Sequence, residues 1–435
     1  MIELVDSLMS VLSRAPLGML ILLFLYYFFI YCTVFWILVL LENRKKIFVD
    51  PKVKEFPRVS IVIPAFNEEK TIAKAIESCL NLNYPKDKLE VIVVNDGSTD
   101  RTREICETYA KKGLIKLINK KNEGKAKALN LGIKHASGEI IGCLDADSYY
   151  QEDALLKMIG YFKDKEVAAV TPALKTEEPK NWLEKIQHLE YLFSIYLRKL
   201  FSFLNCIYVI PGPGSLYRRD VLELVGGFDP ENLVEDTDIA LKIQKHGFRV
   251  ENSVNAVVHT HIPRTFRGLL KQRLRWYGGY LENVLGKHRD MIFFTKSPNL
   301  GLFLIPSNFL WLFSLVYLLG FTLFENFNYT YAVMRNFFII GDPFFLLKSF
   351  RITDFISINF LTAFFLVFLL FSLVLILISI RIGREKVKLK ERYSNYLYYI
   401  ALYFIFISTF WFLSSLWIIY RKVARKKGWR REKVE

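Results

Sequence analysis

Two carboxylates stand two residues apart directly after an apolar run, in the segment 139–147 (EIIGCLDAD). The oxygens of Asp145 and Asp147 suit Mg²⁺ or Mn²⁺, ions that usually complete their coordination with substrate phosphates. A metal bridged to a diphosphate would neutralise the charge that develops on a departing nucleotide. An isolated pair of this kind is commonly a solvated acidic turn, but the position after a buried strand favours a Mg²⁺ or Mn²⁺ site.

A second acidic group, Glu235-Asp236-Thr237-Asp238, opens a predicted helix that extends to His246. Acidic residues at a helix start are ordinarily caps that satisfy free backbone amides and favour the helix dipole. The functional interpretation makes Asp236 a general base. An inverting sugar transfer needs one carboxylate near the acceptor hydroxyl, opposite the leaving group, to take its proton as the new bond forms.

A third group is the segment 272–276 (QRLRW). On a helix Gln272, Arg275 and Trp276 fall at i, i+3 and i+4 and therefore share one face. An indole offers a flat surface to a sugar ring, and a guanidinium offers bidentate contacts to phosphate. An interfacial amphipathic helix with snorkelling arginines and a tryptophan at headgroup level gives the same pattern, and both interpretations can hold together.

Two more side chains have less specific signals. Lys125 stands at a predicted helix start, where it could reach a phosphate, although most exposed lysines only solubilise. His259 and His261 alternate by two and so face one side of a strand-like segment. His261 is a candidate third metal ligand, with neutral polar packing as the commoner alternative.

These residues must be positioned by alternating strands and helices. Short apolar runs predict strands at 59–64, 91–94, 114–118 and 139–144, and helical patterns lie between them at 67–82, 100–112 and 123–135. Successive β-α units imply a parallel sheet covered by helices. In such sheets ligands bind at the carboxyl ends of the strands, where Asp96 and Asp145 are expected to lie.

The ends of the chain are apolar. Four runs lack Asp, Glu, Lys and Arg and exceed the ~20 residues that a helix needs to cross a bilayer, namely 17–41, 300–324, 355–380 and 393–420. Arg44, Lys45 and Lys46 follow the first run, so the positive-inside tendency places the middle region in the cytoplasm of a multi-pass cell-membrane protein. The fourth run has basic clusters on both sides, which conflicts with a simple crossing. The polar-interrupted stretch 331–350 is predicted as a surface helix, after an exterior loop that carries the sequon Asn328-Tyr329-Thr330.

The net charge of +16 is concentrated beside the membrane runs, at 381–392 and 421–433, so anionic lipid headgroups are the expected partner and nucleic acid is not. Five scattered cysteines without a CxxC pair support neither a disulfide framework nor a zinc site. The predicted organisation is an anchor at 1–43, a cytosolic domain at 44–296 with interfacial helices near its end, a transmembrane region at 297–420, and a basic tail at 421–435.

Taken together, the motifs resemble those of the family 2 glycosyltransferases over about residues 56–285. They read VSIVIPAFNEE (59–69), VVNDGSTD (93–100), NEGKAKALNLGI (122–133), LDAD (144–147), GPGSLYRRDVLELVGGFD (212–229), EDTD (235–238) and QRLRW (272–276). QRLRW before membrane spans is similar to the processive β-glycan synthases, which make poly-N-acetylglucosamine, hyaluronan, chitin or cellulose, with the poly-N-acetylglucosamine synthases the most similar. The resemblance implies an α/β fold, an A-type nucleotide-sugar domain that is Rossmann-like with a mostly parallel sheet, plus transmembrane helices.

The resemblance also implies roles for single residues. A UDP-sugar donor would be bound by Pro64, Phe66, Glu68, Asp96, Lys125, Asp145, Gln272 and Arg275. Trp276 and Glu235 would contact the acceptor, Asp145 and Asp147 would hold the metal, and Asp236 would be the base. The segment 259–263 (HTHIP) departs from the family pattern, because His261 stands where an acidic residue is frequent.

The first hypothesis is therefore an inverting synthase that elongates a β-linked polymer from a UDP-sugar, most plausibly UDP-N-acetylglucosamine. The alternative is transfer of a single sugar to a lipid or lipid-linked acceptor, since QxxRW also occurs in ceramide glucosyltransferases. A third class is a nucleotide-sugar-binding membrane protein without catalysis, which would have no need of a base.

Overall fold

The computed structural model describes residues 17–294, 297–340, 360–385, 406, 409–418 and 420. The chain divides into two compact units. One combines Met1–Glu42 with Phe309–Leu375, and the other combines Asn43–Asn308 with Ile376–Glu435. The second unit contains every residue that the sequence nominates for chemistry.

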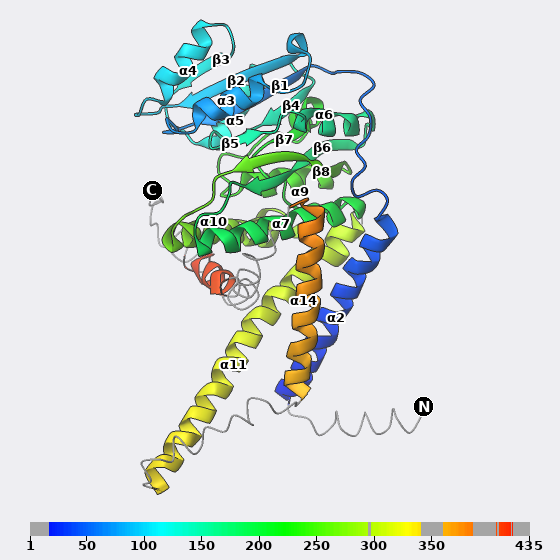
Figure 1. The fold of residues 1–435 in the computed structure, drawn as a ribbon, viewed down its shortest axis with the longest axis vertical. Helices are drawn as coiled ribbons and strands as arrows, with labels where there is room; N and C mark the ends of the chain where they lie inside the picture. Colours follow the sequence, from blue (N-terminus) through cyan, green and yellow to red (C-terminus); the bar gives the residue numbers. More distant parts are fainter. Residues whose placement is uncertain are drawn as a thin grey trace. The chain divides into compact units, whose positions relative to one another are not determined.

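An eight-stranded sheet forms the centre of the second unit (Figure 1), in the order β3 (Lys116–Lys120), β2 (Leu89–Asp96), β1 (Val59–Ala65), β4 (Ile140–Cys143), β7 (Ser215–Arg218), β6 (Val167–Thr176), β8 (Arg249–Thr260) and β5 (Ser148–Tyr150). The first four strands are parallel. Strand β7 is antiparallel to both β4 and β6, β8 is parallel to β6, and β5 is antiparallel to β8. Strands β6 and β8 therefore run in the same direction as the first four, while β7 and β5 run opposite to them. The sheet is mixed, and the expectation of a mostly parallel sheet is correct.

Alternating side chains of the parallel strands explain why helices cover both faces. In β1, Ile61 and Ile63 are buried with Ile76 of α3 (Ile72–Leu80), whereas Val62 is buried with Leu129 of α5 (Lys125–Lys134). Strand β2 divides its side chains in the same way. A period of two in the sequence thus places one helix on each side of the sheet.

The three helices predicted between the first strands all begin later than expected, and two of the delays have a backbone cause. The helix expected at 67–82 is α3, preceded by a turn in which Asn67 has φ of 56°. The helix expected at 123–135 begins at Lys125, because Gly124 has φ of 96° and cannot be helical. The second of these turns brings Lys125 to the start of its helix.

The remaining helices of this unit are α4 (Thr102–Lys111), α6 (Ala154–Ile159), α7 (Trp182–Phe203), α8 (Arg219–Leu224), α9 (Glu235–Lys245) and α10 (Phe266–Glu282). Helix α10 continues into a π-helical turn, η3 (Asn283–Lys287). The described turns at 409–418 pack on α10, where the rings of Tyr277 and Trp411 stack with centroids 4.2 Å apart. Trp417 lies over Gly278, where an added methyl group would be 2.7 Å from the indole.

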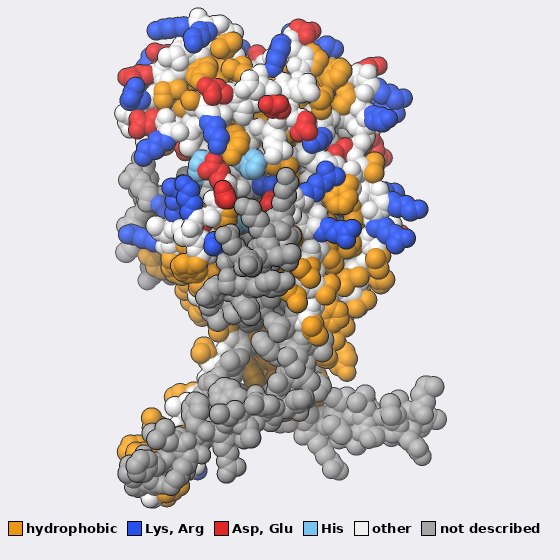
Figure 2. Space-filling model, in the orientation of Figure 1, with side chains coloured by type: hydrophobic (Ala, Val, Ile, Leu, Met, Phe, Trp, Pro, Cys, Tyr) orange, Lys and Arg blue, Asp and Glu red, His pale blue; other side chains and the backbone are white. Residues whose placement is uncertain are grey.

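Within the described part of the chain, two helical segments are long and apolar enough to cross a bilayer, Leu17–Glu42 and Asn299–Phe321. The first is α2 (Leu17–Asn43), and the second leads into α11 (Ile305–Ile340). Inside the first unit, Phe29 and Trp311 have ring centroids 4.4 Å apart. Figure 2 shows acidic and basic side chains interspersed over the sheet-bearing region, whereas the exposed side chains of these long helices are largely hydrophobic.

The C-terminal predictions have unequal outcomes. The exterior loop expected around Asn328 is wrong, because α11 is one continuous helix through that residue. Part of the surface helix expected at 331–350 belongs to the same helix, and residues 341–350 lie outside the described residues. Helix α14 (Phe360–Ile382) matches the third apolar run. Most of the fourth run and the tail at 421–435 lie outside the described residues.

Candidate active site

Three motifs converge on one lysine. Lys125, the first residue of α5, places its Nζ 2.6 Å from Oδ1 of Asp145 and 3.1 Å from Oε1 of Glu235. Asp145 follows β4, and Glu235 is the first residue of α9. A methyl group at Gly212 would lie 2.9 Å from the lysine Nζ, so the backbone of the 211–214 turn closes over this ion-pair group. The structure thus brings Lys125, Asp145 and Glu235 together, as parts of one site.

No side-chain cation of the described residues pairs with Asp147, the second aspartate of the DxD pair. Ser148 donates its hydroxyl to Oδ1 of Asp147 over 2.9 Å. Burial, and then the charge of Asp145, raise the pKa of Asp147 to about 6, and Glu68 adds to the effect. A carboxylate with this electrostatic environment is stabilised by any cation that binds beside it. Within the described part of the chain no group of three His, Cys, Asp or Glu side chains could hold a metal, so a cation here would rely on two carboxylates and on substrate phosphates.

His261 lies beside Asp147, but both of its ring nitrogens have partners. Nδ1 is 2.8 Å from the backbone oxygen of Asp147, and Nε2 is 3.2 Å from the carboxylate of Glu177. Glu177 also pairs with Lys74 at 2.8 Å. Metal ligation by His261 therefore requires the Glu177 contact to open, and it remains a prediction. His259 instead stacks on Tyr149, with ring centroids 5.0 Å apart.

Asp236 differs from its acidic neighbours because no cation pairs with it among the described residues. Its Oδ1 accepts a hydrogen bond of 2.8 Å from the backbone N–H of Thr237. Burial, and then the charge of Glu235, raise its pKa to about 6, although Lys125 and Arg275 oppose the shift. The N-cap of α9 is Val234, which makes no side-chain cap, so the acidic cluster does not act as a conventional N-cap. An ionised Asp236 at neutral pH is a moderately strong base in a partly closed site.

Asp96 has a structural task in this structure. Its carboxylate accepts hydrogen bonds from Lys120 Nζ at 2.6 Å, Glu123 N at 3.0 Å and Gly124 N at 2.8 Å. These bonds hold the turn from which Lys125 begins α5. An open groove of about 560 Å³ adjoins it, lined by residues that include Asn95, Gly97, Ser98, Asn119, Lys120 and Asn122. The predicted uracil contact of Asp96 stays a prediction.

The other residues nominated at the β1 end lie around the same edge of the sheet. Pro64 is half-buried in β1, and the Phe66 side chain that follows is 44% exposed. Glu68 accepts a hydrogen bond of 2.7 Å from Thr71 Oγ1. Their common position at the carboxyl end of β1 is the position that ligands occupy in open α/β sheets.

Helix α10 carries an arginine that the sequence reading missed. Arg273 is almost fully buried and pairs with Glu190 of α7 at 2.6 Å. It donates to Oε1 of Gln272 over 2.7 Å, and its guanidinium lies 4.2 Å from the centre of the Trp276 ring. Arg273 therefore orients two of the nominated side chains. Its place between Gln272 and Trp276 was the available signal, whereas nothing in the α7 sequence singled out Glu190.

The nominated face of α10 is partly turned inward. Trp276 is half-buried against the core beneath α3, so Arg273 and the core together restrict its ring. Arg275 is exposed, and its charge lowers the pKa of both Glu235 and Asp236. Another missed residue, Arg198 of α7, also lies within electrostatic reach of Asp236, and burial lowers its pKa to about 10. Positive charge thus surrounds the acidic motif of α9.

Comparison with known proteins gives a family match inside this unit. The family model described as "Glycosyl transferase family 2" matches residues 60–226. A poly-beta-1,6-N-acetyl-D-glucosamine synthase of Staphylococcus epidermidis is 31% identical over 349 residues, which cover 79% of this chain and 81% of that protein. A probable glycosyltransferase of Bacillus subtilis, YdaM, is 33% identical over 244 residues, which cover 53% of this chain and 57% of that protein.

Solved structures give more distant likenesses. A mannosyltransferase from Pyrobaculum calidifontis, in complex with GDP-Man and Mn²⁺, has a TM-score of 0.47 and 26% identity over 61% of this chain and 76% of its own. Residues 1–349 of TarS from S. aureus, in complex with UDP-GlcNAc, have a TM-score of 0.38 and 19% identity over 56% of this chain and 72% of theirs.

Proposed function

We propose that this chain, which belongs to the family 2 glycosyltransferases, transfers N-acetylglucosamine from UDP-N-acetylglucosamine to the end of a growing β-linked polysaccharide. The observation that carries the proposal is the convergence of Lys125, Asp145 and Glu235 beside Asp236. The choice of donor sugar and polymer is supported by the relatives named poly-beta-1,6-N-acetyl-D-glucosamine synthase.

In the proposed reaction Asp236 removes the proton from the acceptor hydroxyl as its oxygen bonds to C1 of the donor sugar. The bond between C1 and the diphosphate oxygen breaks on the opposite face, so the configuration at C1 inverts and UDP departs with the electron pair. The pKa of about 6 leaves Asp236 ionised at neutral pH and basic enough to accept the proton. Glu235, which pairs with Lys125 at 3.1 Å, would contact the acceptor.

The DxD pair fits a divalent cation in an A-type nucleotide-sugar domain. Asp145 and Asp147 would hold Mg²⁺ or Mn²⁺, which when bound neutralises charge on the donor diphosphate. The raised pKa of Asp147 supports this assignment, because a partly buried carboxylate that forms no ion pair with the described residues is stabilised by a bound cation. His261 would join the pair only after leaving Glu177. Gln272 and Arg275 would contact the diphosphate, and Trp276 the acceptor sugar.

The nucleotide would lie along the carboxyl edge of the parallel strands. The groove next to Asp96 is large enough for a base and ribose, and its lining of amide, hydroxyl and lysine groups suits hydrogen bonding. Pro64, Phe66 and Glu68 would border the nucleotide from the end of β1. Lys125 already has two acidic partners, so in the donor complex it would act as a fixed positive charge near the phosphates.

The domain arrangement proposed from charge is a multi-pass cell-membrane enzyme with its transferase domain, residues 44–296, in the cytoplasm. The apolar segments Leu17–Glu42 and Asn299–Phe321 support a membrane location. The basic residues 44–46 support the cytoplasmic side. The region 297–420 would then return through the bilayer, and the basic tail would contact anionic headgroups.

A screen of UDP release over a panel of UDP-sugars tests the proposal. The purified full-length protein with Mg²⁺ or Mn²⁺ should release UDP fastest from UDP-N-acetylglucosamine and form a polymer. Asp236→Asn should bind UDP but release none from the donor. Faster UDP release from another UDP-sugar would identify that sugar as the donor. A lipid product that carries one sugar would support the non-processive alternative instead of polymer synthesis. Full activity of Asp236→Asn would overturn the assigned base.

A further inference from the structure

A buried carboxylate on the rear of α9 has two lysines and a histidine as partners and no place in the proposed chemistry. Asp238 is fully buried, and its Oδ1 lies 2.7 Å from both Lys287 Nζ and His288 Nε2. Lys242, one turn along α9, lies 3.0 Å from Oδ2. Burial raises the pKa of Asp238, but the hydrogen bonds from His288 and Lys287 and the Lys242 charge lower it to about 2. The carboxylate is therefore ionised throughout the neutral range.

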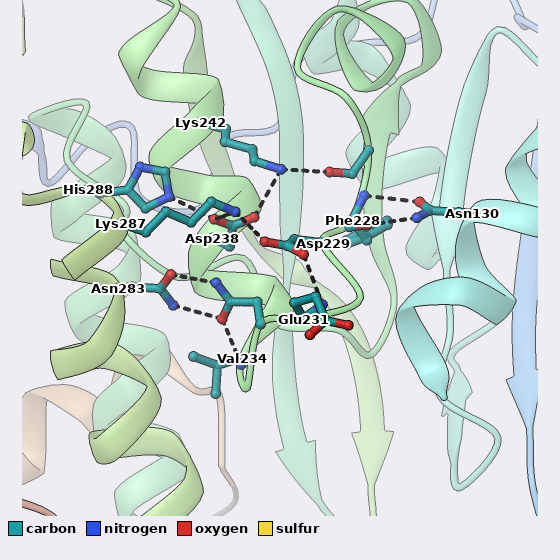
Figure 3. A network of polar contacts seen from close by, with 12 residues as sticks. Asn130, Phe228, Asp229, Glu231, Val234, Asp238, Lys242, Asn283, Lys287 and His288 are labelled. Atoms are coloured by element: carbon teal, nitrogen blue, oxygen red, sulfur yellow. Dashed lines mark hydrogen bonds and ion pairs between the residues drawn. The ribbon is translucent and has the colours of Figure 1, made fainter. Parts of the chain in front are cut away.

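Two of these partners come from the segment that follows the QRLRW helix. The turn η3 is π-helical, with the N–H of His288 donating to the Asn283 carbonyl over 2.8 Å. This wider turn directs Lys287 and His288 toward Asp238 (Figure 3). Because π-helical turns are rare and occur frequently at functional sites, their presence here favours a specific task.

The same segment contacts the loop that leads into α9. Asn283 and Asn232 exchange two side-chain hydrogen bonds, of 2.6 and 3.1 Å, and Asn232 also accepts one from Val234 N over 3.1 Å. Gly279 of α10 faces Val234 so closely that an added methyl group would lie 2.8 Å from its Cγ1. The position of α10 relative to α9 is thus fixed in two ways. Gly279 packs closely on Val234, and Asn283 forms hydrogen bonds with Asn232.

The network extends further to a third motif. Lys287 Nζ also pairs with Asp229 at 2.6 Å, and Asn130 of α5 exchanges hydrogen bonds of 2.7 and 3.0 Å with the backbone of Phe228 (Figure 3). Helix α5 begins with Lys125, which pairs with Glu235. The motifs at 122–133, 212–229 and 235–238 are therefore connected behind the site as well as in it.

Asp236 and Asp238 are two residues apart, so their side chains point about 200° apart around α9. We propose that the Asp238 cluster, defined as Asp238, Lys242, Lys287 and His288, is a positioning device. It holds the face of α9 that carries Asp236 at a fixed distance from the face of α10 that carries Gln272, Arg275 and Trp276. Lys287 is its central positioning residue. The inference rests on the proposed function, because that function assigns the base to the face of α9 and the donor contacts to the face of α10.

Lys287→Met tests the device without unpairing Asp238, since His288 and Lys242 remain. We expect kcat to fall by roughly tenfold to a hundredfold, because small misplacements of reacting groups cost that much, while KM for the UDP-sugar stays close to that of the wild type. Amide hydrogen exchange at 235–241 should accelerate. Lys287→Arg, which keeps the charge, should restore most of the kcat and most of the protection from amide exchange. The matched control is Lys245→Met, which removes a surface ion pair between α9 and Asp290 without touching Asp238.

Unchanged exchange at 235–241 in Lys287→Met would overturn the positioning device, whatever the activity. A lower melting temperature with unchanged kcat would also overturn it, because Lys287 would then act only on stability. A wild-type protein that transfers no sugar from any UDP-sugar would refute the proposed function instead. The exchange comparison between Lys287→Met and Lys245→Met would still decide whether the cluster holds α9.

Discussion

At the scale of single residues, the site contains two aspartates with similar pKa values and different expected partners. Burial is the first cause of the shift to about 6 for both Asp147 and Asp236, and a neighbouring carboxylate is the second. Asp147 is proposed to bind a metal ion, whereas Asp236 is proposed to accept a proton from the acceptor hydroxyl. Their titrations should therefore respond differently to a divalent ion.

The pH dependence of transfer should reflect Asp236. The base acts when ionised, so kcat/KM should be constant above about pH 6 and fall as the pH decreases through that value. Saturating Mn²⁺ should leave this limb in place, because the metal displaces the proton of Asp147 but does not bind Asp236. Stopped UDP-release assays from pH 5 to 8 at two metal concentrations measure this pH dependence of kcat/KM. A limb that moves to lower pH with added metal would assign it to Asp147 instead.

Asp147→Asn should separate metal binding from folding. Its pKa is raised in the folded protein, so without metal the free energy of unfolding decreases as the pH rises toward about 6 and stays lower above it. The amide should therefore raise the melting temperature of the metal-free protein at pH 7.5. It should also reduce metal-dependent transfer by roughly a hundredfold or more, since a metal supplies several kcal/mol. A melting temperature that is unchanged, together with full activity, would remove Asp147 from the site.

The residue types at the site could be predicted better than their contacts. The spacing of Asp145 and Asp147 and the EDTD group identified the acidic residues, because carboxylates after a strand or at a helix start have few common roles. The ion pair between Lys125 and Glu235 and the burial of Arg273 beside Glu190 could not be predicted, since each joins residues 83 or more positions apart. Asp238 looked like a cap, and only its partners from 287 and 288 show otherwise.

At the scale of elements, α10 and α9 approach each other through a glycine. Gly279→Ala would press a methyl group against Val234, and overpacking of this kind costs about 1–3 kcal/mol. We expect a lower melting temperature and a lower kcat. Gly286→Ala is the matched control, because no atom lies within 4 Å of the methyl group it would add. Thermal unfolding and UDP release of both variants measure the difference, and equal behaviour would contradict the close packing of the two helices.

The first half of the sheet could be predicted from the sequence, whereas the second half could not. Strands β1, β2 and β4 follow from alternating apolar residues, and their parallel order follows from the helices between them. Strand β7 reverses direction after α7 and the glycine turn at 211–214, and local periodicity does not encode strand direction. The mixed second half of the sheet therefore appears only when distant segments pair.

At the scale of the whole molecule, the proposed topology can be tested by cysteine labelling. All five native cysteines are buried, so they should react little with a membrane-impermeant maleimide. Lys112 and Asn328 are exposed. In intact cells Asn328→Cys should be labelled and Lys112→Cys should be labelled only after permeabilisation, because the transferase domain is proposed to be cytoplasmic. The opposite pattern would reverse the orientation.

Membrane organisation is the least completely predicted feature of this chain. Charge-free runs identified α2, the start of α11 and α14 as helices. They did not reveal that α11 continues for 36 residues, about 54 Å at the usual helical rise. Such a helix is longer than a bilayer core of about 30 Å. The polar residues after position 324 are the reason why a loop was predicted there.

The length of the product made from UDP-N-acetylglucosamine distinguishes polymer synthesis from transfer of a single sugar. The full-length protein should be incubated with Mg²⁺ or Mn²⁺ and a large excess of acceptor, and the reaction stopped when a small fraction of donor is consumed. A processive synthase should yield long polymers beside unextended acceptor, and Asp236→Asn should yield neither polymer nor short product. Acceptors extended by one sugar only would contradict polymer synthesis by this chain.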